Sequence, residues 1–209
     1  MNSDVSTLAD WIAQSPSTVF FGGAGVSTES GIPDFRGANG FYFQEREIPL
    51  ETVLSIDFFS QHPEAYWEWF HEIYHPVEPN GAHRALAALE GTGLLDAVIT
   101  QNIDGLHQRA GSRAVWELHG NWERLVCTAC GSVAALHDAV TVDGDPVPAC
   151  PSCGGQMRPD IVMYGESLDE GVIEAAVSAI ARASTLIVAG TSLVVYPAAG
   201  LINYFSGDH

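Results

Sequence analysis

The sequence predicts an α/β protein, with a parallel sheet covered by helices on both faces and a small second lobe. Short apolar runs alternate with segments of helical periodicity, as at Thr18–Phe21 and Ala97–Thr100. Each run leads into a polar or glycine-rich segment, which is typical of loops at the carboxyl edge of a parallel sheet. Four cysteines in two close pairs interrupt this alternation between residues 121 and 158.

The length and composition of the chain indicate how large a core it can form and where in the cell we expect it. The chain has 209 residues, 46% of them hydrophobic, which is enough for one core or a core with a small satellite module. No apolar run approaches the roughly 20 residues that span a membrane. The N-terminus has neither the basic region nor the apolar core of a signal peptide. We therefore expect a cytoplasmic location and no membrane partner.

The charge balance excludes several classes of function. The formal net charge is -18, and all 8 residues counted as lysine or arginine are arginines. Without lysine, a Walker phosphate loop and Schiff-base catalysis are excluded. The acidic balance argues against direct binding of nucleic acid, which needs a basic face. It suits basic protein segments as partners, although acidic surfaces often serve only solubility.

A β-rich run followed by glycines opens the first βα unit. Thr18–Phe21 leads into Gly22–Gly25, and a short helix is expected from about Ser27 until Gly31-Ile32-Pro33 ends it. Such a corner can bind phosphate, because glycines let backbone N–H groups approach an anion beside a helix N-terminus. A tight βα loop without a ligand is the alternative. Asp34-Phe35-Arg36 favours a ligand, because a plain loop needs no such acid, aromatic and base.

The usual dinucleotide fingerprint is incomplete. Gly23-x-Gly25 is followed by Thr28 where a third glycine is expected, and no strand with a ribose-binding acid appears before residue 50. A conventional dehydrogenase is therefore disfavoured. We expect the segment that starts at Gly31 to begin a lid over the site.

Helical periodicity and capping residues predict the helices. Val5, Leu8 and Ile12 share one face of a first helix that Pro16 ends, and Asn80 is a typical N-cap. The longer predicted helices are Asp4–Gln14, Pro63–Tyr74, the segment from Asn80 to Gly91, Leu168–Ala183 and Pro197–Phe205. The aromatic residues of the second of these are expected to form a small satellite core.

Continuous apolar runs predict four parallel strands. They are Thr18–Phe21, Ala97–Thr100, Val115–Leu118 and Leu186–Ala189. Because the carboxyl ends of parallel strands meet at one edge, where ligands bind, the loops after them should gather there. The segments expected at this edge are Ala24–Arg36, Gln101–Asp104, His119 and Gly190–Ser192. The sequence thus predicts a Rossmann-like sheet.

The cysteines form two pairs, Cys127-x-x-Cys130 and Cys150-x-x-Cys153, with 19 residues between the pairs. This spacing is typical of a structural zinc site of four thiolates, which leaves no open position for water. A redox pair is the alternative, and the second matching pair disfavours it. The chain then divides into a discontinuous Rossmann-like domain (1–36, 80–120 and 159–209), a lid and helical segment (37–79) and a zinc-ribbon module (121–158).

Several long motifs resemble those of the sirtuins, the NAD-dependent protein lysine deacylases. They follow the family's order over nearly the whole chain, and the opening Phe21–Ala24 is similar to the bacterial branch. The matching motifs are Gly23–Ser27, Gly31–Arg36, Thr100–His107, Glu117–Gly120, both cysteine pairs, Val162–Glu166 and Gly190–Leu193.

The resemblance implies a role for each matching residue, with NAD as co-substrate and one structural zinc ion. The residues implied to bind NAD are Gly22, Ala24, Thr28, Asp34, Phe35, Arg36, Gln101, Asn102, Ile103, Asp104, His119, Gly190, Thr191 and Ser192. The substrate would be an acyl-lysine protein, whose backbone would pair with Val162, Met163, Tyr164 and Gly165. His119 would be the catalytic general base, with Asn102 as a second catalytic residue. Histidine suits this task because its unperturbed pKa is about 6.5.

The implied reaction moves an acyl group from lysine to ADP-ribose. The acyl oxygen attacks the ribose carbon that carries nicotinamide and displaces nicotinamide. The base then takes a proton from a ribose hydroxyl, whose oxygen attacks the acyl carbon. Of the other histidines, we expect His107 to pack against its loop, while His62, His71, His75 and His83 stay unassigned. Without the resemblance, Asn102 and Asp104 would read equally well as turn residues.

Preference for acidic acyl chains is associated in this family with a Tyr-x-x-Arg pair on the helix before the Pro-Asn-x-Ala-His segment. Here that helix, Pro63–Tyr74, contains no arginine. An anionic acyl chain would therefore lack a countercharge. We expect preference for acetyl or other small neutral acyl groups.

The chain departs from the family at its end. It stops at His209, whereas sirtuins continue with a further strand and a short element, about 30 residues on the scale of such units. Losing an inner strand would expose neighbouring sheet edges and remove half of the adenine pocket. Three other functions stay open: an NAD-dependent protein ADP-ribosyltransferase that uses the same pocket, a non-catalytic NAD- or peptide-binding module, which the short end would suit, and a zinc-ribbon adaptor. The adaptor alone would not need Asn102, Asp104 and His119.

Overall fold

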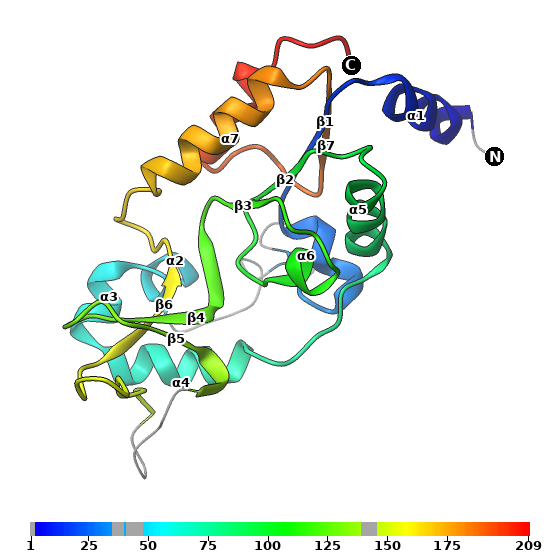
Figure 1. Cartoon of the computed structure of the whole chain (residues 1–209). Coiled ribbons are helices and arrows are strands. Elements are labelled where there is room, and N and C mark those ends of the chain that lie inside the picture. The colour runs from blue at the N-terminus through cyan, green and yellow to red at the C-terminus, as the bar shows by residue number, and fades with distance from the viewer. Residues whose placement is uncertain (1–2, 35–39, 41–47, 139–145) are drawn as a thin grey trace.

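The structure, a computed structural model, describes residues 3–34, 40, 48–138 and 146–209. Two sheets mark two lobes that lie beside each other (Figure 1). The helices are α1 Ser3–Gln14, η1 Ala24–Ser30, α2 Leu50–Val53, α3 Ile56–Gln61, α4 Pro63–Ile73, α5 Gly81–Gly91, α6 Leu106–Arg109, η3 Leu136–Asp138, α7 Glu170–Arg182 and η4 Ala198–Tyr204. The strands are β1 Thr18–Gly22, β2 Ala97–Thr100, β3 Val115–Glu117, β4 Gly120–Cys127, β5 Val133–Ala135, β6 Met157–Ile161 and β7 Thr185–Ala189.

The first lobe contains the predicted parallel sheet. Within the described residues its order is β3-β2-β1-β7, and every neighbouring pair is parallel. β1 and β2 are buried along their whole length, as their continuous apolar runs predict. The four strands are those expected from the sequence, with boundaries that differ by a residue.

Helices cover both faces of this sheet, as predicted. Val19 and Phe21 of β1 pack on one face with residues of α7 and η4. Phe20, which points the other way, packs with Val26 of η1 and Leu86 of α5. Figure 1 shows α7 on one side of the sheet and α5 on the other. Alternate side chains of one apolar strand thus serve two separate cores.

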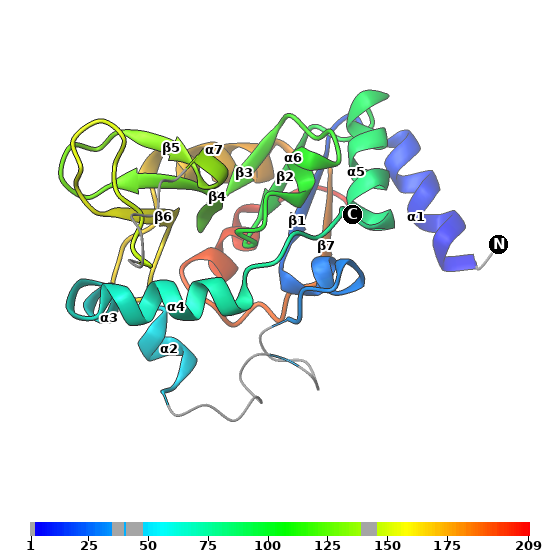
Figure 2. The same cartoon turned by 90° about the horizontal axis from the view of Figure 1, so that it is seen from below.

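The second lobe joins the predicted zinc module to the aromatic helix. Its antiparallel sheet has the order β5-β4-β6, and Figure 2 shows this sheet on one side of the lobe with α2, α3 and α4 on the other. Tyr66, Trp67 and Phe70 of α4 pack into one buried cluster with Trp122 and Leu125 of β4. The aromatic satellite core is therefore present, and it is shared with the cysteine-bearing strands. The three-part division of the chain stays a prediction.

Local signals set most helix ends. Asn80 caps α5 with a complete capping box, and Asp169 caps α7 through the backbone N–H of Val172. Gly31 ends η1 in the left-handed conformation that glycine favours. η1 and η4 are 3₁₀ helices, and η1 begins at Ala24, three residues before the expected start. The predicted lid falls largely on residues 35–39 and 41–47, outside the described residues. No helix of the described part is long and apolar enough to cross a membrane.

Candidate active site

A cavity of about 710 Å³ lies at the carboxyl edge of the parallel sheet and extends to the second lobe. The loops after all four strands contribute to it, as the strand order requires. Site residues from these loops that line the cavity are Ala24, Asp34, Gln101, Asn102, Ile103, Asp104, His119, Gly190, Thr191 and Ser192. Gly22 and Thr28 do not line it. Phe35 and Arg36 lie outside the described residues.

The glycine corner differs from the expected phosphate cradle. The N–H of Gly23 donates to the carbonyl of Ala189 (3.3 Å), and the N–H of Gly25 donates to that of Gly190 (2.8 Å). These two N–H groups are therefore not available to an anion, which corrects that expectation. A Cβ on Gly25 would meet the backbone of Gly190 at 2.9 Å. The glycines let the loops after β1 and β7 pack directly against each other.

Behind the corner lies a buried polar network centred on Ser27. The hydroxyl of Ser27 donates to Asp104 Oδ2 (2.6 Å) and accepts from Asn102 Nδ2 (3.0 Å). Asp104 Oδ1 accepts the N–H of Leu106 (2.9 Å), which ties the carboxylate to the start of α6. Asn102 and Asp104 are 8% and 6% exposed, so they are held from behind and present one side to the cavity.

His83 completes this network, and its tautomer follows from its contacts. The N–H of Asn80 donates to His83 Nδ1 (3.2 Å), so Nδ1 must carry the lone pair. The proton of neutral His83 is then on Nε2, which lies 3.5 Å from Ser27 Oγ. The sequence alone indicates no role for His83 or Ser27. The N-cap at Asn80 was the available signal, because the capping box places the third helical side chain beside the cap.

His119 is oriented by the loop after β2. Its Nδ1 lies 2.8 Å from the carbonyl oxygen of Gln101, which can only accept a hydrogen bond. Nδ1 therefore carries the proton, and Nε2 keeps the lone pair that a general base needs. Burial lowers the pKa of His119, while the bond to Gln101 acts in the opposite direction. His119 is thus held in its neutral, basic form near neutral pH.

The loop after β7 is tied to the loop after β2. Gln101 Nε2 donates to Thr191 Oγ1 (2.9 Å), and its backbone N–H donates to the carbonyl of Gly22 (3.0 Å). The carbonyl of Gly22 thus holds the loop after β2 in place from behind the cavity. Thr28 Oγ1 donates to the carbonyl of Gly25 (3.0 Å) on an exposed turn of η1.

The expected substrate edge lies on the other side of the cavity, and Val162, Met163, Tyr164 and Gly165 all line it. The N–H of Tyr164 donates to the carbonyl of Leu54 (2.9 Å), and its carbonyl accepts from Ile56 (3.0 Å). The N–H of Val162 donates to the carbonyl of His119 (2.9 Å). The segment is therefore anchored to both lobes.

A partly buried ion pair shapes the end of this segment. Arg158 Nη1 and Nη2 each lie 2.6 Å from an oxygen of Glu166, and Glu166 Oε2 accepts the N–H of Met163 (2.9 Å). The hydrogen bonds from Arg158 and Met163 lower the pKa of Glu166 against the opposing effect of burial. The pair thus closes the turn from Met163 to Glu166.

The four cysteines converge in the second lobe. Their Sγ atoms all lie within 4.8 Å of one another, with Cys127 and Cys153 at 3.5 Å and Cys130 and Cys150 at 3.8 Å. A zinc ion bound to four sulfurs at about 2.3 Å places them about 3.8 Å apart. The cluster therefore fits a tetrathiolate zinc site. Ser132 Oγ lies 3.1 Å from both Cys130 Sγ and Cys150 Sγ.

His107 packs as expected and makes the protein sensitive to acid. It is 1% exposed, contacts His83 and Phe20, and neither ring nitrogen has a hydrogen-bond partner among the described residues. Burial, and secondarily the nearby His83, lowers the pKa of His107 to about 3. Since the unfolded chain takes up the proton at about pH 6.5, stability is fully present above that pH and is lost as pH falls towards 3.

We expect His107→Leu to remove this sensitivity. Between pH 7 and pH 4.5 the free energy of unfolding of the wild type should fall by about 2–3 kcal/mol more than that of the variant. Urea unfolding at each pH measures the difference, and His62→Leu, at an exposed histidine, is the control. Parallel curves for wild type and His107→Leu would contradict the prediction.

Comparisons with known proteins agree with this arrangement. Residues 23–197 match the model of the Sir2 family. An NAD-dependent protein deacetylase of Clostridium acetobutylicum is 50% identical over 208 residues, which cover 98% of this chain and 84% of the relative. One of Thermotoga maritima is 47% identical over 196 residues, covering 92% and 78%.

Solved structures show the same likeness. A Sir2 complex with a p53 peptide and NAD+ has a TM-score of 0.84 at 45% identity, covering 96% of this chain and 81% of that one. A Sir2 protein bound to a propionylated peptide has a TM-score of 0.84 at 43% identity, covering 98% and 81%. This chain belongs to the Sir2 family, the sirtuins.

Proposed function

We propose that this protein is an NAD-dependent protein lysine deacetylase. The observation that carries the proposal is the placement of His119. Its Nδ1 is bound to Gln101, which leaves the lone pair on Nε2, and its ring lines one cavity with the strand-end loops and the edge Val162–Gly165. Relatives at about half identity carry the name NAD-dependent protein deacetylase. This name disfavours two of the alternatives, an NAD-dependent protein ADP-ribosyltransferase and a module that binds NAD or peptide without catalysis.

We assign the residues of the cavity as follows. Gln101 and Asn102 hold the ribose near the reacting carbon, and Ile103 and Asp104 hold the nicotinamide carboxamide. Thr191 and Ser192 contact the adenosine half of NAD. We propose that Ala24, Asp34 and Gly190 of the cavity bind the rest of NAD. The resemblance adds Gly22 and Thr28, which do not line the cavity, and Phe35 and Arg36, which lie outside the described residues. The burial of Asn102 and Asp104 supports this assignment, since both are already oriented before NAD binds.

His119 is the general base of this reaction. Its Nδ1–H bond to Gln101 fixes the ring and leaves Nε2 to take the proton of a ribose hydroxyl. Because Gln101 is also assigned to the ribose, one residue positions both the base and the group it deprotonates. One water is consumed when the lysine amine leaves the acyl carbon, and the products are deacylated lysine, nicotinamide and O-acyl-ADP-ribose.

Val162, Met163, Tyr164 and Gly165 bind the backbone of the acyl-lysine segment by β-augmentation. The anchors of Val162 and Tyr164 in the two lobes support this role, since they hold the edge in place beside the cavity. Cys127, Cys130, Cys150 and Cys153 hold one zinc ion, whose closed thiolate site supplies stability and no open position for catalysis. We further propose a cytoplasmic location, since clustered free thiols suit a reducing compartment.

Mass spectrometry of an acetyl-lysine peptide incubated with NAD tests the function. We expect loss of the acetyl group from the peptide together with equal amounts of nicotinamide and O-acetyl-ADP-ribose. The unacetylated peptide is the control. Consumption of NAD at the same rate with either peptide, or ADP-ribose attached to protein, would refute the deacetylase.

The cavity predicts the acyl preference. Of the described residues that line it, none is an arginine, and α4 contributes Trp69, Phe70 and Ile73. A succinyl carboxylate would be buried here without a countercharge, which costs a few kcal/mol. We expect kcat/KM for an acetyl-lysine peptide to exceed that for the succinyl peptide by at least about tenfold. Faster removal of succinyl would contradict this.

A further inference from the structure

We propose that Arg124 is a positioning residue that holds the base His119 and the substrate edge Val162–Gly165 in fixed relation. It does not itself line the cavity. The proposal rests on the proposed function and deepens it. It concerns the junction where the chain passes from the parallel sheet into the second lobe (Figure 1).

Arg124 lies where β4 leaves its regular pairing with β6. Asn121 pairs with Asp160, and Leu125 pairs with Pro159, the neighbour of Asp160 on β6. Residues 122–124 therefore lie between two consecutive pairs and have no paired residue of their own on β6. A bulge of this kind bends the strand and redirects its side chains. The N–H of Trp122, the first bulged residue, donates to the carbonyl of Ile103 (2.9 Å) in the loop after β2.

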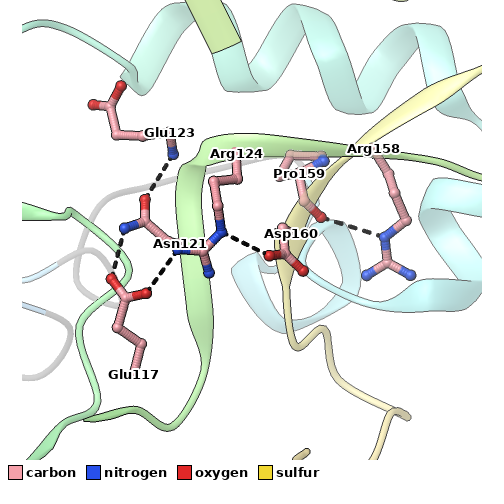
Figure 3. A network of polar contacts seen from close by, with 7 residues as sticks. All are labelled: Glu117, Asn121, Glu123, Arg124, Arg158, Pro159 and Asp160. Carbon is pink, nitrogen blue, oxygen red and sulfur yellow. Dashed lines mark hydrogen bonds and ion pairs between the residues drawn. The ribbon is translucent and has the colours of Figure 1, made fainter. Parts of the chain in front are cut away.

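The bulge turns Arg124 towards two carboxylates from different strands (Figure 3). Arg124 Nη1 donates to Glu117 Oε2 (3.0 Å), and Nε donates to Asp160 Oδ2 (2.9 Å). The second oxygen of Glu117 accepts from Asn121 Nδ2 (2.6 Å). The Glu117 side chain is only 10% exposed, so these partners supply hydrogen bonds that water can no longer fully provide.

The two carboxylates have the same separation in sequence from the site segments that they support. Glu117 lies two residues before His119, and Asp160 lies two residues before Val162. The N–H of Val162 donates to the carbonyl of His119 (2.9 Å), which joins the two segments directly. The pairing of Gly120 with Ile161 and of Asn121 with Asp160 continues this link until the bulge interrupts it. Arg124 adds a side-chain attachment at the bulge through a planar guanidinium, whose rigid geometry fixes the angle as well as the separation.

Kinetics of Arg124→Gln and Arg124→Lys test the proposal. Glutamine removes the positive charge. Lysine keeps the charge but lacks the planar guanidinium, whose N–H groups donate to both carboxylates. We expect both variants to lose about tenfold or more in kcat/KM for the acetyl-lysine peptide, since a small misplacement of reacting groups slows the reaction strongly. The affinity for ADP-ribose, measured by calorimetry, should change less than about twofold, because its assigned contacts lie on other loops.

Arg109→Gln is the matched control. Arg109 also bridges a carboxylate and a second acceptor, Glu78 Oε1 (2.8 Å) and the carbonyl of Val77 (2.6 Å), with similar side-chain exposure (38% against 43%). Its removal should leave peptide kinetics within about twofold, as for a surface ion pair. Wild-type kinetics in Arg124→Lys, or equal losses for peptide and ADP-ribose, would overturn the proposal.

Hydrogen exchange separates this proposal from the function it rests on. If wild type does not deacetylate the peptide, the proposed function fails, and the Arg124 proposal is judged by exchange alone. We expect the N–H of Val162, which donates to the carbonyl of His119, to exchange at least about tenfold faster in Arg124→Lys, since this hydrogen bond is less firmly held. Unchanged exchange there would overturn the positioning role.

Discussion

His119→Ala is expected to lower kcat/KM for deacetylation by about 10²–10⁴-fold, the usual contribution of a general base. The ring donates Nδ1–H to Gln101 and offers Nε2 to the reaction, and alanine removes both. The fold should persist, because the bond to Gln101 is one contact at the end of β3. Steady-state kinetics with an acetyl-lysine peptide measure the loss, and circular dichroism checks the fold.

The pH profile gives an independent test of the same residue. Burial lowers the pKa of His119, so the neutral base persists to more acidic pH and the acid limb of kcat/KM should lie below pH 6.5. His137→Ala, at an exposed histidine, should leave both rate and profile unchanged. A His119→Ala variant that keeps more than about a tenth of wild-type activity would refute the assignment.

Cys127→Ser should unfold the second lobe and leave the parallel sheet folded. Zinc binding to four thiolates contributes about 10–16 kcal/mol in small zinc modules, which exceeds the stability of most lobes of this size. Cys127 and Cys150 are also buried in the cluster that contains Trp67 and Trp122. We therefore expect loss of bound zinc, a red shift of tryptophan fluorescence and loss of peptide turnover.

The control for this prediction is Ser152→Ala, which changes an exposed residue between two of the cysteines. It should bind one zinc ion per chain and keep wild-type fluorescence. Extraction of zinc from wild type with a strong chelator should reproduce the effects of Cys127→Ser. A metal-free protein with native fluorescence and turnover would show that the thiol cluster does not stabilise the lobe.

Much of the fold was predictable because local pattern and global packing agree. β1 and β2 are apolar at every position except their ends, and a strand with that pattern must be covered on both faces. Polar strand ends then meet at one edge, so Asn102, Asp104, His119 and Thr191 could be grouped from the sequence. The cysteine spacing likewise predicted a cluster that the structure contains.

Other features had no local signal. The glycine corner predicted free N–H groups, but Gly23 and Gly25 donate to carbonyls at the end of β7, a contact between residues more than 160 positions apart. His83 and Ser27 meet only because α5 packs beside η1. Hydrogen bonds of this kind depend on the mutual placement of elements, which periodicity does not encode.

The sequence by itself determined the strands of the parallel sheet, the longer helices around it, the loops at its carboxyl edge and the four thiol ligands. These follow from hydrophobic period, capping and spacing, which act over a few residues. The tertiary structure alone decided the tautomers of His83 and His119, the shared core of α4 with the cysteine strands, and the link from Arg124 to Glu117 and Asp160. Each of these is set by the distance and angle between elements that are remote in sequence.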